Sequence, residues 1–142
     1  MKIKQSVCYP MMRPSIHMGL EEFIPAIARI GFSGIEIWGR DDQFSDLIRL
    51  ARANNLTLTA MIGHDGFNHG LNNPATHAIS EKELKESIDI AAEYGIPGLI
   101  CLSGNRRDGE SEEEAMEATT AGLRMVEPYA EVKGINLNLE LF

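Results

Sequence analysis

The chain has 142 residues, 44% of them hydrophobic, and its formal net charge is −8 at pH 7. This length predicts one domain over residues 1–142, complete in itself or part of a larger one. The acidic balance argues against nucleic acid as a partner, because phosphate backbones bind basic surfaces.

Cysteine usage and the apolar runs bear on where the protein is found. Cys8 and Cys101 lie in apolar runs without metal-ligand spacing, which predicts buried thiols in a reducing compartment. No apolar run reaches the roughly 18 residues of a membrane span, and no hydrophobic signal core follows residues 1–4. We therefore expect a cytoplasmic protein without a membrane partner.

The first half of the chain alternates strand and helix patterns. Apolar residues at helical spacing end at Gly31, and Pro25 is tolerated only near a helix start, so this helix should begin at Glu21 or Glu22. Asp41 or Asp42 is a candidate cap for the next helix. The predicted elements are a strand over 3–9, a helix to 31, a strand over 34–39, a helix to 54–55 and a strand over 56–62.

The second half continues the alternation after a long polar loop over 66–78. Ser80 and Ser111 are each followed three residues later by Glu, the capping-box pattern of a helix start. Gly95 and Gly134 are the expected helix ends, and Pro128 should kink or split the second helix. Strands are predicted over 96–103 and 135–142, with a Gly-rich and Arg-rich loop at 104–109.

This order predicts an α/β protein whose parallel strands are joined by crossover helices. An open doubly wound sheet and part of a (β/α)8 barrel both fit it. No Gly-x-Gly-x-x-Gly follows the first strand, which removes the usual reason to favour a dinucleotide-binding sheet. Polar residues alternate with apolar ones at Glu36 and at Asn136, Asn138 and Glu140, which favours a barrel with a polar interior.

At this point the sequence resembles the xylose-isomerase-like barrels, most closely the hydroxypyruvate-isomerase-like proteins. The matching segments are 6–10, 31–36, 63–64, 70–72, 96–101, 103–106 and 139–140. The resemblance implies a partial (β/α)8 TIM barrel of about four βα units plus a fifth parallel strand. It also implies a divalent metal, Mg²⁺ or Mn²⁺, and isomerisation of small hydroxy-carbonyl substrates.

The resemblance assigns Glu140 two roles, as metal ligand and as proton-transferring base at the end of the fifth strand. Removing a proton beside a carbonyl forms an enediolate, which requires a base and stabilisation of the oxyanion. The family's remaining ligands come from the sixth to eighth strands. We therefore expect this chain to be an N-terminal portion of a longer protein, with little or no isomerase activity alone.

Five other residues are candidates for substrate binding. Glu36 and Trp38 share a strand face, although Glu36 also suits a structural ion pair and Trp38 plain core. His64 ends a strand, but alternation from Thr57 and Thr59 places it on the opposite face unless the strand bends at Gly63. Asn105 and Arg106 follow the fourth strand, where a guanidinium suits a substrate carboxylate and an exposed turn is the alternative.

Other functions remain open at this point. A sugar epimerase or an inosose dehydratase would use the same barrel, and a nuclease acting on abasic DNA is disfavoured by the acidic charge. A non-catalytic half-barrel would instead work by association, because its first and fifth strands are unpaired edges. We therefore expect homo-oligomers, with two copies approximating a closed barrel.

Overall fold

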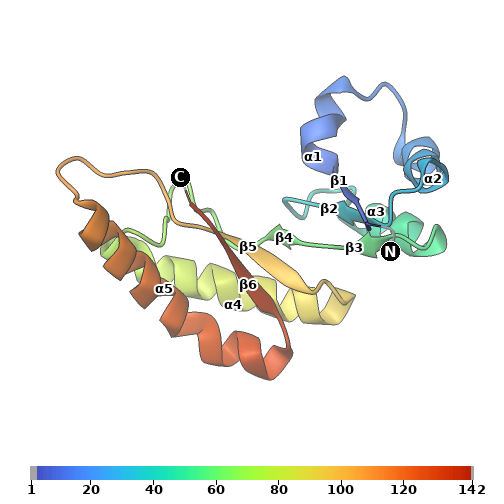
Figure 1. Ribbon diagram of the computed structural model, residues 1–142. Helices are drawn as coiled ribbons and strands as arrows, with labels where there is room; N and C mark the ends of the chain where they lie inside the picture. Colours follow the sequence, from blue (N-terminus) through green and yellow to red (C-terminus); the bar gives the residue numbers. More distant parts are fainter. Residues whose placement is uncertain (1–2, 142) are drawn as a thin grey trace.

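A computed structural model describes residues 3–141, and the predicted strand end at Phe142 lies outside them. Strands and helices alternate along the chain (Figure 1). The strands are β1 (Ser6–Cys8), β2 (Gly34–Glu36), β3 (Thr57–Leu58), β4 (Met61–Ile62), β5 (Gly98–Leu102) and β6 (Asn136–Glu140). The helices are α1 (Tyr9–Met12), α2 (Leu20–Ile30), α3 (Phe44–Ala53), α4 (His77–Tyr94) and α5 (Glu112–Lys133), with 3-10 turns η1 (Arg13–Ser15) and η2 (Pro74–Thr76).

All strand pairs are parallel and form two three-stranded sheets, β1-β2-β3 and β4-β5-β6. One chain segment joins the sheets, because β3 and β4 are two parts of the strand predicted over 56–62. Thr59 N donates to Ile35 O at 2.9 Å on one side, and Gly63 N donates to Ile100 O at 2.9 Å on the other. The predicted partial TIM barrel, with five parallel strand positions, is therefore confirmed.

Between β3 and β4 the regular alternation of side chains between the two strand faces is interrupted. Leu58 lies in the buried core, whereas Thr59 shares the other face with Gly34, since a Cβ on Gly34 would lie 2.6 Å from Thr59 Cγ2. Ala60 and Met61 are then both buried, and Met61 pairs with the core residue Leu99. An extra residue of this kind moves every later side chain to the opposite face.

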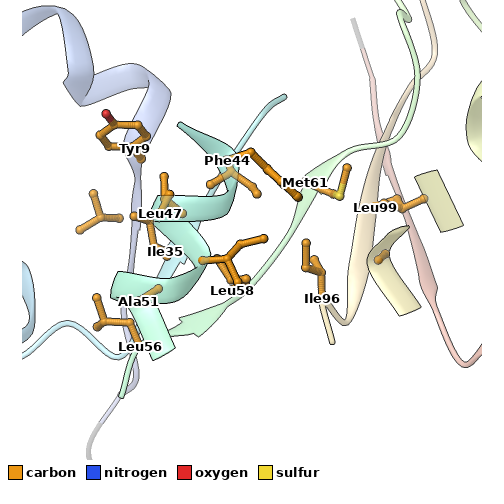
Figure 2. Packing of buried hydrophobic residues seen from close by; sticks show 14 of the residues in the cluster. Tyr9, Ile35, Phe44, Leu47, Ala51, Leu56, Leu58, Met61, Ile96 and Leu99 are labelled. Carbon is orange, nitrogen blue, oxygen red and sulfur yellow. The ribbon is translucent and has the colours of Figure 1, made fainter. Parts of the chain in front are cut away.

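Helices cover one face of the strands and bury it in a continuous apolar core (Figure 2). Leu99 and Cys101 of β5 are fully buried there. The two halves of the core meet where the ring of Phe44 in α3 packs edge-on against Tyr94 in α4, with centroids 5.4 Å apart. Arg52 Nη2 also donates to Tyr94 O at 2.8 Å.

Two predicted helix starts and one missed helix need correction. Neither Asp41 nor Asp42 caps α3, which begins at Phe44 after Gln43, although Asp41 Oδ1 accepts from Gln43 N at 3.0 Å. The predicted start at Ser80 is wrong, since α4 begins at His77 and the Ser80 hydroxyl donates to Thr76 O at 3.2 Å and to His69 O at 2.7 Å. A serine hydroxyl that donates to main-chain oxygens in this way does not act as a helix cap. The short helix α1 was not predicted, because Pro10 looked like a strand terminator, yet proline suits the first turn of a helix.

The predicted start of α5 is confirmed. Ser111 Oγ accepts from Glu114 N at 3.2 Å, and Ser111 N donates to Glu114 Oε2 at 2.9 Å, which completes a capping box. Pro128 does not split this helix, which continues to Lys133 and ends at Gly134 in the left-handed region. No helix among residues 3–141 combines the length and apolar character needed to cross a bilayer.

Replacing the cap tests how much it stabilises α5. Ser111→Ala should lower the free energy of unfolding by about 1 kcal/mol, because Glu114 N loses its acceptor. Urea denaturation would measure the change. Ser45→Ala, at an exposed position inside α3, should change it by less than about 0.5 kcal/mol; an equal loss in both variants would contradict the role of the cap.

Candidate functional site

Polar side chains collect on the strand face that the helices leave uncovered. The register of β5 and β6 places Gly98, Ile100 and Leu102 beside Asn136, Asn138 and Glu140. A Cβ on Gly98 would lie 2.6 Å from Asn138 Nδ2, so these residues share one face. Glu140 ends β6 on that face and is exposed. Its main-chain oxygen accepts from Ser103 N at 3.0 Å, which ties it to the loop that follows β5.

A second polar group lies at the carboxyl ends of β1 and β2. Glu36 is half-buried beside Cys8 in the register of the strands, and Trp38 Nε1 donates to Glu36 Oε1 at 3.2 Å. Burial and a hydrogen bond with Glu36 raise the pKa of the Cys8 thiol, which keeps it protonated. Glu36 thus has hydrogen-bond partners in Trp38 and Cys8, but the alternative of an ion pair with Arg or Lys is not found among residues 3–141. Trp38 is 42% exposed, so it is not part of the core.

The predicted burial is found for the second cysteine only, because Cys8 is partly exposed. Cys101 is fully buried in the core, and burial raises its pKa to about 12. Both thiols are free. Cys101 therefore acts as a small apolar residue, whereas Cys8 lies among the polar groups at the strand ends.

His64 is buried at the end of β4 and uses both ring nitrogens. Its Nε2 accepts from Leu102 N at 3.1 Å, and its Nδ1 lies 3.2 Å from His69 O. If β4 continued as a strand, a main-chain oxygen of β4 would accept from Leu102 N, and here the His64 ring nitrogen takes its place. This geometry requires a neutral ring with the proton on Nδ1, and burial lowers the pKa of His64 accordingly.

The strand irregularity that would turn His64 to the other face was expected at Gly63, but it lies earlier, at Ala60 and Met61. Alternation restarts at Met61, so Ile62 lies beside Ile100, and His64 follows on the Ile62 side. The two hydrogen bonds of His64 account for its burial without a ligand. Substrate contact by His64 stays a prediction.

Asn105 and Arg106 are exposed on the loop after β5. Asn105 Nδ2 donates to Phe67 O at 3.3 Å, and Arg106 Nη2 donates to Glu110 O at 3.5 Å. Because Ser103 N is bonded to Glu140 O, this loop leaves the sheet beside Glu140. The structure therefore brings Glu140, Asn105 and Arg106 to neighbouring strand ends, with His64 at the end of β4 in the same sheet, and it places Glu36 and Trp38 on the other sheet. Arg106 lines a groove with Leu139 and Leu141, which alternate with Glu140 along the chain.

Asn72, Arg107 and Glu110 were not among the candidate site residues predicted from the sequence. Asn72 lies in the predicted loop over 66–78, and Arg107 and Glu110 lie in or directly after the predicted loop over 104–109. Glu110 is buried and paired with Arg107. Their sequence signal was weak, because an Arg and a Glu three residues apart in a loop usually form a solvated pair.

Among residues 3–141 there is no group of three or more His, Cys, Asp or Glu side chains placed to hold a metal ion. Glu140 alone offers one carboxylate, whereas Mg²⁺ takes about six oxygen ligands. The described residues therefore do not fit a complete Mg²⁺ or Mn²⁺ site. A cation at Glu140 would require ligands from outside this range.

Comparison with known proteins identifies the architecture. Residues 24–142 match the family model described as xylose isomerase-like TIM barrel. A sugar phosphate isomerase/epimerase from Parabacteroides distasonis has a similar structure, with a TM-score of 0.75 and 13% identity over 97% of this chain and 51% of that one. For 3-keto-D-glucoside 4-epimerase from E. coli the TM-score is 0.72, with 18% identity over 98% of this chain and 55% of that one.

A D-psicose 3-epimerase from Clostridium cellulolyticum H10 is also similar, with a TM-score of 0.71 and 16% identity over 95% of this chain and 51% of that one. At these identities the likeness concerns the fold. The chain spans about half the length of these structures. A comparison with curated protein sequences gives no match.

The hydrogen bonds of His64 predict a pH-dependent stability. Because folding lowers its pKa below the ordinary 6.5, the unfolded chain binds the proton more readily, and stability should fall as the pH drops below 6.5. His64→Phe should lower the free energy of unfolding at pH 7.5 by about 1–3 kcal/mol, because Leu102 N loses its acceptor. Urea denaturation at pH 7.5 and 5.5 would measure both effects.

The His64→Phe variant should also show a smaller difference between the two pH values than the wild type. His17→Gln, at an exposed position, is the control and should keep the wild-type difference. An unchanged pH dependence in His64→Phe would show that other groups cause it.

Proposed function

Because the chain belongs to the xylose isomerase-like TIM barrel family, we propose that it is the N-terminal part of an isomerase of the hydroxypyruvate type. The supporting observation is the position of Glu140, exposed on the uncovered strand face and bonded through its main chain to the loop that carries Asn105 and Arg106. A base (Glu140) and a guanidinium that can bind a carboxylate (Arg106), at neighbouring strand ends, suit a small hydroxy-keto acid as substrate.

In this proposal the Glu140 carboxylate removes a proton from the carbon beside the substrate carbonyl, which forms an enediolate. The proton then returns to the former carbonyl carbon, and the proton of the substrate hydroxyl moves to the former carbonyl oxygen. The carbonyl group thereby moves by one position with no net oxidation. Arg106 binds the substrate carboxylate through its guanidinium, and Asn105 donates a further hydrogen bond. Glu36, Trp38 and His64 are proposed to contact the rest of the substrate.

We propose that Glu140 is also one ligand of Mg²⁺ or Mn²⁺ in the longer protein, with its other ligands outside residues 3–141. A divalent cation held there would supply positive charge close to the substrate oxygens. The proposed setting is the cytoplasm, in agreement with the free thiols.

A sugar epimerase is the second candidate, favoured by the epimerases among the similar solved structures. Epimerisation shares the first step, removal of a proton beside a carbonyl. It then returns the proton to the same carbon from the opposite face, which requires a second group there. A neutral sugar would make no use of a carboxylate-binding Arg106, and this favours the isomerase.

Proton exchange tests the proposal directly. In D₂O with Mg²⁺, a longer form of the protein carrying the rest of the barrel should exchange the C3 protons of hydroxypyruvate, measured by ¹H NMR. Glu140→Gln should slow this exchange by about 10²–10⁴-fold, because the base is lost. Glu127→Gln, on the exposed surface of α5, is the matched control and should exchange at the unaltered rate.

The 142-residue chain alone should exchange these protons little faster than buffer. Turnover of hydroxypyruvate by this chain at ordinary enzyme rates would contradict its proposed dependence on further barrel segments. If the longer form exchanged a carbon-bound proton of D-fructose but none of hydroxypyruvate, the epimerase would be favoured.

We further propose that the 142-residue chain self-associates. The edge strands β1 and β6 each have one partner among the described strands. Beside β6, Met116, Leu123, Leu139 and Leu141 line the apolar part of a groove of about 550 Å³, whose polar part includes Arg106. The exposed fractions of Met116 and Leu141 are 70% and 75%, an apolar surface that a second copy would cover.

Light scattering across micromolar concentrations should therefore show dimers or larger species. The double variant Met116→Lys, Leu141→Lys should shift the population toward monomer, because two charges cannot be buried without partners. Ile30→Lys adds charge at an exposed position on α2, away from the groove, and should associate as the wild type does. A wild-type chain that remains monomeric would contradict the proposal.

A further inference from the structure

Two polar side chains are buried in the loops that follow β4 and β5. Asn72 is 5% exposed and Glu110 is 8% exposed. A buried amide or carboxylate is costly unless its hydrogen bonds are made, so its partners indicate what it holds in place. Here the partners lie in both loops.

Glu110 collects four hydrogen bonds from two residues. Its Oε2 accepts from Arg107 N and from Asn72 Nδ2, both at 3.2 Å. Its Oε1 accepts from Arg107 Nε at 3.2 Å and also from Arg107 Nη2. The hydrogen bonds from Arg107 lower the pKa of Glu110, so the carboxylate is charged at neutral pH. The carboxylate thus closes the loop over 104–110 on itself.

Asn72 connects that loop to the preceding one. Its main-chain N donates to Ser103 O at 2.7 Å, and its Nδ2 donates to Asn105 O at 2.8 Å as well as to Glu110. The fit is close, since a Cβ on Gly104 would lie 2.5 Å from Asn72 Oδ1, and Gly104 has a φ of +104°. Glycine is therefore required at 104 both for space and for backbone conformation.

The two residues of this loop that are proposed to bind substrate are both exposed. Asn105 is held through its main-chain oxygen by Asn72, and Arg106 is held through Nη2 by the main-chain oxygen of Glu110. Both residues remain exposed on a loop that leaves the sheet beside Glu140, and Arg106 lines the groove that contains Leu139 and Leu141. A guanidinium fixed in this way is prepared to bind an anion with less loss of conformational freedom.

We propose that Asn72 and Glu110 are positioning residues that hold Asn105 and Arg106 in place to bind the carboxylate of the substrate. We call the Asn72, Arg107 and Glu110 side chains the loop clasp. This inference rests on the proposed function, because it takes Arg106 as the substrate-binding cation. It adds that the site selects carboxylate-bearing hydroxy-carbonyl compounds over neutral sugars.

The first readout is the mobility of the loop, which requires no ligand. In the ¹⁵N-labelled 142-residue chain, the backbone amides of residues 105 and 106 should show heteronuclear NOE values close to those of β5. Glu110→Gln, which removes the charge, and Asn72→Asp, which removes the donor, should each lower these two values while the β5 values stay unchanged. Glu112→Gln, exposed two residues away, should leave the loop ordered.

The second readout is affinity for a carboxylate probe. Titration with glycolate, followed by NMR, should give a dissociation constant that Glu110→Gln, Asn72→Asp and Arg106→Gln each raise about tenfold. Glu112→Gln should leave it unchanged. If Glu110→Gln proves too unstable to fold, Asn72→Asp alone carries the same test.

The outcomes separate the inference from the proposed function. Ordered amides at 105 and 106 in both clasp variants would overturn the loop clasp. A mobile loop with unaltered glycolate affinity, in a protein where Arg106→Gln weakens binding, would overturn its role in positioning. Failure of the wild-type chain to bind glycolate would overturn carboxylate selection and the role of Arg106, while loop mobility in the variants would still support the clasp.

Discussion

Burial of one face of the parallel strands against the helices is the constraint on which the rest of this structure depends. Leu58, Met61, Leu99 and Cys101 lie on that face, and each is at most 4% exposed. Parallel sheets are stable when both faces are covered, yet here the opposite face carries Asn136, Asn138 and Glu140 and is open. The helices fix the strands from one side, which leaves the other side free for polar side chains.

Much of the fold was predictable because this constraint leaves a regular pattern in the sequence. The five strand positions and the helices α2, α3 and α5 follow from apolar periodicity. Gly31 and Gly134 mark the ends of α2 and α5, and Ser111 marks the start of α5, whereas the predicted aspartate cap of α3 is wrong. The resemblance to the xylose-isomerase-like barrels was confirmed at the level of the family. The start of α4 was missed because Ser80 and Glu83 form a capping pattern by composition, while Ser80 bonds to main-chain oxygens inside the helix.

The site was less predictable, because its structure depends on contacts between distant loops. Glu140 and Arg106 were chosen from their places at strand ends, and the pairing of β5 with β6 brings their segments together. Nothing in the local sequence marks Asn72 as the partner of Glu110, since 38 residues separate them. His64 illustrates the same limit, because its acceptor role toward Leu102 N exists only once β4 and β5 are aligned.

The extra residue between Thr59 and Met61 has a consequence for comparing this chain with other barrels. An alignment that counts strand positions onward from Thr57 assigns the wrong face to everything after Ala60, including Ile62 and His64. A count that allows for one extra residue at this point places Ile62 and His64 on the same face as Ile100. In evolutionary terms, the deletion of a single codon here would keep the reading frame of the gene. It would nevertheless exchange the core-facing and interior-facing residues in the rest of the strand.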